Sequence, residues 1–120
     1  MTTPSEVIAR RRADREALLR SAREYVEGLA GDLDVLAAVV VGSVARGDFH
    51  DASDVDLIVV VGDLPDDAAA RWSLVAPRHG VVQPIAWTAE EWHGQCQRRN
   101  PLAVDAVAHG VWLVGSPDVL

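Results

Sequence analysis

Lysine is absent from this chain of 120 residues, whose eleven basic side chains are all arginine. Without lysine, the chain can hold neither a Walker A phosphate loop nor a Schiff-base or protein-kinase lysine. The single cysteine, Cys96, excludes an internal disulfide and a cysteine-rich zinc site. No apolar run approaches the roughly 18 residues that cross a bilayer, and Met1 to Arg23 resemble no signal peptide. We therefore expect a soluble, cytoplasmic protein without a membrane partner.

Positive charge is also scarce, and the formal net charge of −7 argues against extensive nucleic-acid binding. Between Asp32 and Asp67 the chain carries nine aspartates and one cation, Arg46. Aspartates at this density repel one another unless water or a cation screens them. For the outer members of the run we expect a solvated acidic surface; these are Asp32, Asp34, Asp63, Asp66 and Asp67.

Hydrophobic residues make up 49% of the chain, enough for a core, and no repeat or linker divides residues 1–120. We therefore expect a single domain. Thr3 and Glu6 form the pattern of a capping box that begins a long helix. Continuous valine-rich runs predict buried strands at 35–41 and 55–61. Gly42 and Ser43 end the first run, and a helical turn could follow them.

The second half of the chain predicts further elements in alternation. We expect a helix from Asp63 to about Ala76, a strand over 81–87, helices over 89–99 and 101–108, and a short strand over 111–114. Pro84 lacks an N–H, so the strand that holds it should lie at a sheet edge or carry a bulge. The predicted fold class is α+β (α/β mixed), a small mixed sheet with helices packed against it.

The most informative segment joins the first two predicted strands. Asp54 and Asp56 are two residues apart at the start of a strand, so their carboxylates point to the same face. Two carboxylates held side by side repel, and a divalent cation such as Mg²⁺ relieves that repulsion. An exposed acidic strand entry is the simpler interpretation of this pair taken alone.

The other end of the segment offers groups for an anion. Gly42 permits a sharp turn and close approach of a ligand, and a helical turn beginning at Ser43 would present free N–H groups. Arg46 could add a forked cation for phosphate. A phosphate cradle at one strand end and a metal site at the next together describe a site for a metal-bound nucleoside triphosphate.

Gly42-Ser43, ten residues, then Asp54-Val55-Asp56 resembles the signature of the DNA polymerase β-like nucleotidyltransferase superfamily, and of its minimal nucleotidyltransferases in particular. The resemblance implies the palm fold of that superfamily. It implies that Gly42 and Ser43 hold the β- and γ-phosphates and that Asp54 and Asp56 are catalytic and bind Mg²⁺, two ions in an active enzyme. It further implies transfer of a nucleoside monophosphate, AMP if the substrate is ATP, to a hydroxyl of a protein or small molecule.

The same resemblance implies a protein partner. The smallest members act with a separate helical partner, a HEPN protein in bacterial toxin–antitoxin pairs. A domain of this size without an acceptor-binding region of its own is expected to form a homo- or hetero-oligomer.

The sequence departs from the family pattern at Gln83, where the resemblance implies a third carboxylate. A glutamine amide carries no charge and cannot accept the proton of an acceptor hydroxyl. Nucleotide and Mg²⁺ binding could then persist while transfer is slow or absent, as in a nucleotide- or partner-binding module such as an antitoxin. Acidic candidates to replace the missing group are Glu90, Glu91 and Asp105.

Two other residue types are open to functional interpretation. Of the four histidines, His50 lies inside the motif segment and is the best candidate for a substrate contact, although a surface role is simpler. The tryptophans are spread over four predicted elements, which favours core packing or a partner surface over a base-stacking platform. They are Trp72, Trp87, Trp92 and Trp112.

Overall fold

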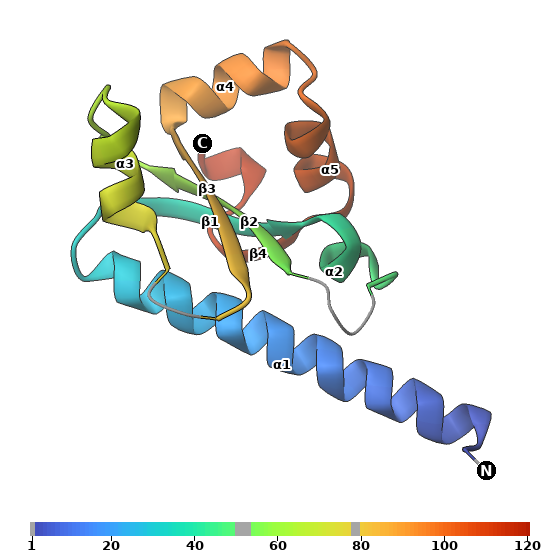
Figure 1. The fold of residues 1–120 in the computed structure, drawn as a ribbon. Helices are drawn as coiled ribbons and strands as arrows, with labels where there is room; N and C mark the ends of the chain where they lie inside the picture. The colour runs from blue at the N-terminus through green and yellow to red at the C-terminus, as the bar shows by residue number, and fades with distance from the viewer. Residues whose placement is uncertain (1, 50–53, 78–79) are drawn as a thin grey trace.

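A computed structural model describes residues 2–49, 54–77 and 80–120 (Figure 1). The motif residue His50 therefore lies outside the described residues. The elements are, in chain order, α1 (Pro4–Ala30), β1 (Val35–Val41), α2 (Gly42–Arg46), β2 (Val55–Val61), α3 (Ala68–Val75), β3 (Val82–Thr88), α4 (Ala89–Gln97), α5 (Pro101–His109), β4 (Val111–Val114) and a final 3₁₀ turn (Pro117–Val119).

The four strands form one mixed sheet in the order β3-β2-β1-β4. Strand β1 runs antiparallel to both β2 and β4, whereas β2 and β3 are parallel and are joined by the crossover through α3. The strand containing Pro84 is at the sheet edge, which confirms the prediction made from its missing N–H. The expected mixed sheet with packed helices is also confirmed.

Helices cover both faces of the sheet (Figure 1). Alternate residues of β2, Leu57 and Val59, face a core shared with α1. The intervening Ile58 and Val60 face a second core shared with α4 and α5. Because both faces are buried, the central strands are valine-rich throughout instead of alternating with polar residues.

The predicted helix starting at Asp63 is wrong at its beginning, since α3 starts only at Ala68. Asp67 caps this helix by accepting a hydrogen bond from the Ala70 N–H at 2.8 Å. Upstream, Leu64 is buried and the Pro65 carbonyl accepts a hydrogen bond from the Arg71 guanidinium. These tertiary contacts hold the segment before Asp67 as an irregular turn.

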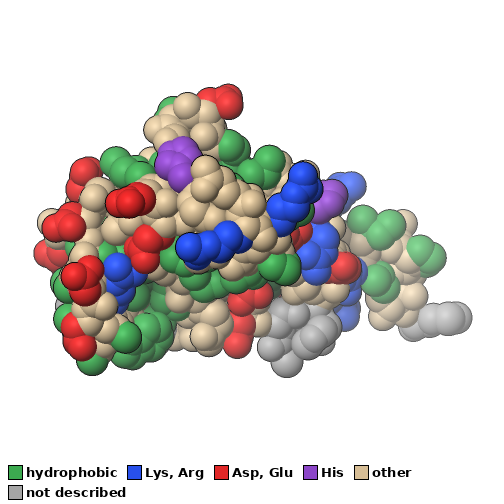
Figure 2. All heavy atoms as spheres, turned by 90° about the horizontal axis from the view of Figure 1, so that it is seen from above, with side chains coloured by type: hydrophobic (Ala, Val, Ile, Leu, Met, Phe, Trp, Pro, Cys, Tyr) green, Lys and Arg blue, Asp and Glu red, His purple; other side chains and the backbone are tan. Residues whose placement is uncertain are grey.

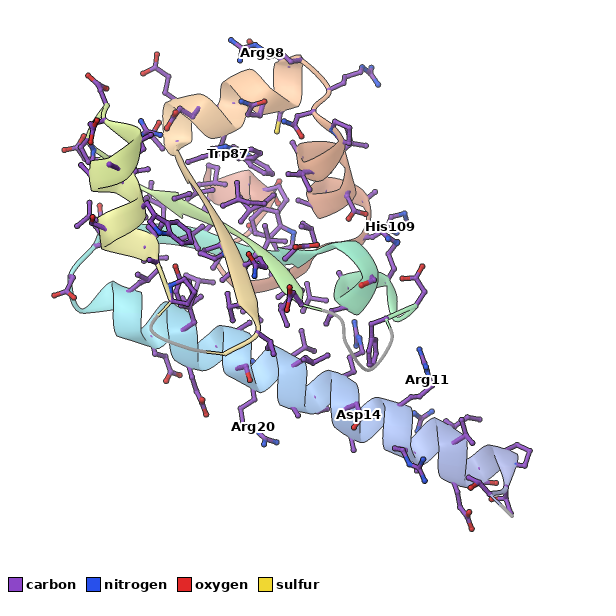
Figure 3. All side chains as sticks on the ribbon, viewed as in Figure 1. Arg11, Asp14, Arg20, Trp87, Arg98 and His109 are labelled. Carbon is purple, nitrogen blue, oxygen red and sulfur yellow. The ribbon has the colours of Figure 1, made fainter. Side chains whose placement is uncertain are left out.

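Three of the four tryptophans pack in the second core, the one shared with α4 and α5. The Trp92 ring is buried and lies 6.2 Å from the Trp87 ring and 5.8 Å from the Trp112 ring, centroid to centroid. Trp87, labelled in Figure 3, belongs to β3, and Trp92 belongs to α4. Trp72 is instead 53% exposed. The core-packing interpretation therefore holds for three residues and does not hold for Trp72.

The outer aspartates of the acidic run are exposed, as expected for a solvated surface; these are Asp32, Asp34, Asp63, Asp66 and Asp67. In Figure 2 acidic side chains are numerous at the end of the molecule that carries α3, to the left in that view. Among the described residues, no helix is both long enough and apolar enough to span a membrane.

Candidate active site

The sheet topology brings the two halves of the motif together. In an antiparallel pair, the exit of one strand lies beside the entry of the next. Val41 at the end of β1 is accordingly opposite Asp56 at the start of β2. On the other side, Asp56 is opposite Gln83 of the parallel strand β3. Asp56 therefore stands between the glycine turn and the position at which a third carboxylate was expected.

Asp54 and Asp56 lie at the entry of β2 with different exposure. Val55 between them is completely buried, Asp56 is half-buried and Asp54 is exposed. Burial, and then the negative charge of Asp54, raise the pKa of Asp56. A carboxylate whose charge is disfavoured in this way is stabilised by a divalent cation bound between it and its neighbour.

Two acidic side chains, Asp54 and Asp56, are available as metal ligands at the start of β2. Among the described residues, no group of three or more histidine, cysteine, aspartate and glutamate side chains could hold a metal ion. The two carboxylates fit Mg²⁺, which commonly takes one or two protein carboxylates and completes its shell with phosphate oxygens and water.

Gly42 has two structural reasons to be glycine. Its φ is +75°, a left-handed conformation that side chains rarely adopt. A Cβ at this position would also lie only 3.0 Å from Asp56 Oδ2. The carboxylate of Asp56 is thus packed against the backbone that opens α2. The helical turn expected after the glycine is confirmed, and no side chain of Val41 caps it.

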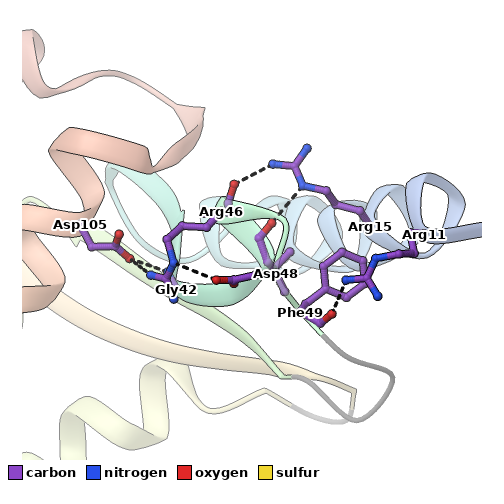
Figure 4. A network of polar contacts seen from close by, with 9 residues as sticks. Arg11, Arg15, Gly42, Arg46, Asp48, Phe49 and Asp105 are labelled. Carbon is purple, nitrogen blue, oxygen red and sulfur yellow. Dashed lines mark hydrogen bonds and ion pairs between the residues drawn. The ribbon is translucent and has the colours of Figure 1, made fainter. Parts of the chain in front are cut away.

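The opening of α2 is contacted by an acid from a distant helix (Figure 4). Asp105 Oδ2 on α5 accepts a hydrogen bond from the Gly42 N–H at 2.7 Å and another from Arg46 Nη1 at 3.1 Å. Arg46 also pairs with Asp48, at 3.6 Å. Ser43, the other predicted phosphate ligand, is half-buried in the first turn of α2.

Gln83 is the neighbour of Asp56 on the parallel strand β3. It is exposed, and its Nε2 lies 3.4 Å from Asp54 Oδ2, a long hydrogen bond. An amide donor therefore faces the carboxylate pair where the family resemblance implies a third acid. This contact partly offsets the repulsion between Asp54 and Asp56, but it adds neither negative charge nor a base.

None of the three acidic candidates replaces the missing carboxylate. Glu91 caps α4 through Thr88 and pairs with Arg71 at 2.9 Å. Burial acts to raise the pKa of Glu91, but hydrogen bonds from Thr88 and Arg71 outweigh it, so the pKa is lowered. Glu90 is exposed in the first turn of the same helix, and Asp105 contacts Gly42 and Arg46 instead. That suggestion is therefore wrong.

A hollow of about 470 Å³ lies between α2 and α5; it is lined by Gly42, Arg46, Pro101, Leu102, Val104, Asp105, Ala108 and His109. His109, labelled in Figure 3, stands at the end of α5. The contacts of Asp105 on α5 with Gly42 and Arg46 were not predicted from the sequence, which suggested Asp105 only as a replacement for the missing third acid. The only available signal was an acid on an otherwise apolar predicted helix, which does not say what the acid contacts.

Comparisons with known proteins identify the family of this chain and proteins of similar fold. The sequence matches the model of the nucleotidyltransferase domain family over residues 19–107. A candidate nucleotidyltransferase from Sulfolobus solfataricus has a similar structure, with a TM-score of 0.64 and 26% identity over 85% of this chain and 84% of that chain.

A toxin–antitoxin structure with AMP-PNP is more distant. It has a TM-score of 0.52 and 22% identity over 80% of this chain and 75% of that chain, and shows the similarity of fold alone. None of the curated proteins is similar enough in sequence to count as a match. The family match covers most of the chain and includes Gly42, Ser43, Asp54, Asp56 and Gln83. The chain therefore belongs to the nucleotidyltransferase domain family.

Proposed function

We propose that this protein is a Mg²⁺-dependent nucleotidyltransferase that transfers a nucleoside monophosphate, AMP from ATP, to a hydroxyl of a protein partner or small molecule. The observation that carries the proposal is the position of the Asp56 carboxylate, which lies beside Asp54 and against the backbone of Gly42. A pair of metal-binding acids and an anion-binding turn thus meet at one point. Family membership makes nucleotide transfer the chemistry to test first.

In this proposal each half of the site has one task. Asp54 and Asp56 would hold Mg²⁺, which neutralises charge on the triphosphate when it is bound. Gly42, Ser43 and Arg46 would bind the β- and γ-phosphates and orient the α-phosphorus toward the acceptor. The acceptor oxygen would form a bond to the α-phosphorus as the bond to pyrophosphate breaks, and the hydroxyl proton would pass to solvent water, because Gln83 cannot accept it. Positioning and charge neutralisation would supply most of the rate.

A second candidate function has a specific observation in its favour. Gln83 places an amide, 3.4 Å from Asp54, where an acid would take up the proton that the acceptor hydroxyl releases. With that base absent, the protein would bind nucleotide and a partner but transfer little or nothing. An antitoxin of a pair with a HEPN-like helical protein would fit this role. The toxin–antitoxin fold neighbour makes such a protein a sensible acceptor to test.

The experiment measures binding and transfer separately. Calorimetric titration with ATP and Mg²⁺ should give a dissociation constant, and Asp54→Asn should abolish or strongly weaken it. Asp63→Asn removes the same charge from an exposed position away from the motif and is the matched control. Transfer is followed with ATP labelled on the α-phosphate and a hydroxyl acceptor, either a co-purifying protein or glycerol, together with pyrophosphate release.

Three outcomes decide between the functions. Metal-dependent label transfer that Asp54→Asn removes supports the transferase. Binding that Asp54→Asn removes, without transfer to the acceptors tested and without pyrophosphate release, supports the binding module. If Mg²⁺–ATP binds neither the original protein nor any variant with an intact Asp54–Asp56 pair, both functions are wrong.

A further inference from the structure

The Asp105 carboxylate already occupies the groups that the proposed function assigns to phosphate. One oxygen, Oδ2, accepts both the Gly42 N–H, at 2.7 Å, and Arg46 Nη1, at 3.1 Å (Figure 4). A phosphate oxygen is bound in the same way, by a backbone N–H together with a guanidinium. The side chain of Asp105 is only 16% exposed, so this carboxylate is held within the site and is not a mobile surface group.

A triphosphate and this carboxylate cannot make the same contacts together. Both are anionic, and in a partly buried site their mutual repulsion is weakly screened. Nucleotide binding at Gly42 and Arg46 would therefore require the Asp105 side chain to turn away and lose both hydrogen bonds. The free energy needed to move the Asp105 side chain out of these contacts reduces the free energy of nucleotide binding by the same amount, and so weakens the affinity.

The structure has room for such a movement and does not depend on Asp105 to hold α5. Ala103 and Ala106 of α5 are buried in the core on one face of the sheet. The Ala106 carbonyl also accepts a hydrogen bond from Trp112 Nε1 at 3.2 Å. Beside the carboxylate is the hollow of about 470 Å³ between α2 and α5. The side chain can rotate into this open space while the helix stays in place.

We propose that Asp105 is an autoinhibitory carboxylate that competes with the triphosphate for the Gly42 N–H and Arg46, and thereby limits the affinity of the site for nucleotide. This inference rests on the proposed function, because it assumes that phosphate binds at those groups. An autoinhibitory role and a supporting role predict opposite effects of removing Asp105 on the affinity for nucleotide. If Asp105 merely positioned Arg46 for phosphate, its removal would weaken nucleotide binding.

The test is calorimetric titration of Mg²⁺–ATP into the full chain and three variants. Asp105→Asn keeps the shape of the side chain and removes its charge, whereas Asp105→Ala clears the site. Both should bind Mg²⁺–ATP about tenfold more tightly than the original protein, a difference of about 1.4 kcal/mol. Asp48→Asn is the matched control, since Asp48 also pairs with Arg46 but is exposed. It should change the affinity by less than about twofold.

The outcomes separate this inference from the proposed function. Unchanged or weaker binding in both Asp105 variants, with clear binding by the original protein, overturns the inference and leaves the proposed function intact. Binding by the variants alone supports both, because the original carboxylate would then be blocking the site. Absence of binding in every protein, each folded by circular dichroism, overturns both.

Discussion

Asp56 lies half-buried beside Asp54, and burial and the neighbouring charge raise its pKa. Without a cation, the folded protein therefore holds this carboxylate in a place where its charge is disfavoured. Residues in such positions commonly reduce stability in exchange for a binding function. Substitution of this single carboxylate should therefore increase the stability of the metal-free protein.

Asp56→Asn should raise the melting temperature of the metal-free protein by roughly 2–5 °C at pH 7. Because the pKa of Asp56 is higher in the folded protein than in the unfolded chain, folding is penalised wherever this group is ionised. The penalty disappears as the pH falls through the folded-state pKa. The difference between variant and original protein should therefore shrink on acidification and be lost below about pH 4. Calorimetric scans from pH 3 to pH 8 measure it.

Asp63→Asn is the control for this experiment, because Asp63 is exposed outside the motif. It should shift the melting temperature little at any pH in the range. The same Asp56→Asn protein should no longer be stabilised by Mg²⁺–ATP. A lower melting temperature for Asp56→Asn at pH 7 would contradict the argument.

Gln83→Glu restores an acid beside the carboxylate pair. It replaces the amide 3.4 Å from Asp54 with a group that can accept a proton, so transfer should rise by about 10²-fold. Without metal, the added charge should lower the melting temperature, and Mg²⁺ should recover the loss. Pyrophosphate release and thermal unfolding with and without Mg²⁺ measure the two effects.

Gln97→Glu provides the comparison for Gln83→Glu, since it adds the same charge at an exposed position at the end of α4. It should change neither the rate nor the response to Mg²⁺. If Gln83→Glu leaves transfer unchanged while binding Mg²⁺–ATP normally, the missing acid is not what limits the reaction.

At the scale of elements, α2 depends on α1. A helix of five residues is too short to be stable alone, and its last carbonyls need partners. Arg15 on α1 supplies them, with Nε 3.0 Å from the Val44 carbonyl oxygen and an Nη 2.9 Å from that of Ala45 (Figure 4). Arg11 adds a hydrogen bond to the Phe49 carbonyl oxygen and lies over the Phe49 ring. The arginine-rich helix thus holds α2, the turn that we propose binds phosphate.

Arg15→Ala should destabilise the protein by about 1–3 kcal/mol, because it leaves the two α2 carbonyls without their charged donor. Arg15→Lys should recover part of this loss, since an ammonium keeps the charge but lacks the fork that reaches both oxygens. Chemical denaturation measures both. Arg12→Ala, at an exposed position of the same helix, should have little effect. Equal losses for Arg12→Ala and Arg15→Ala would show that helix charge matters and the specific contacts do not.

At the scale of the whole molecule, stability is unevenly distributed. The strands β1 and β2 are central in the sheet, and most of their side chains are buried. In contrast, residues 4–14 of α1 are all exposed, and this end of the helix projects from the body of the protein (Figure 1). The longest dimension is accordingly 54 Å, against 30 and 21 Å for the other two.

Amide hydrogen exchange should reproduce this distribution. The amides of β1 and β2 should exchange at least about a hundredfold more slowly than those of residues 4–14, because opening the central strands requires disruption of both cores. Exchange followed by mass spectrometry or NMR measures the difference. Comparable protection of the projecting helix end in a monomeric sample would contradict the distribution of burial described above.

Much of the fold could be predicted from local patterns. The valine-rich runs predicted β1 and β2 at their observed bounds, the Thr3–Glu6 capping box predicted the start of α1, and Pro84 predicted an edge strand. Each signal depends on residues close together in the chain. The beginning of α3 was not predictable in this way, since buried Leu64 and a contact to Pro65 hold the preceding turn.

For the candidate site, local patterns in the chain identified the chemical groups: a glycine–serine turn, the Asp54–Asp56 pair, and an amide where the family resemblance implies an acid. How these groups come together depends on strand pairing and helix packing. Pairing of β2 with its two neighbours places Asp56 beside Val41 and Gln83, and packing of α5 brings Asp105 to Gly42, 63 residues away. A contact over such a separation depends on the burial of whole helix and sheet faces, which no local pattern of residue types specifies.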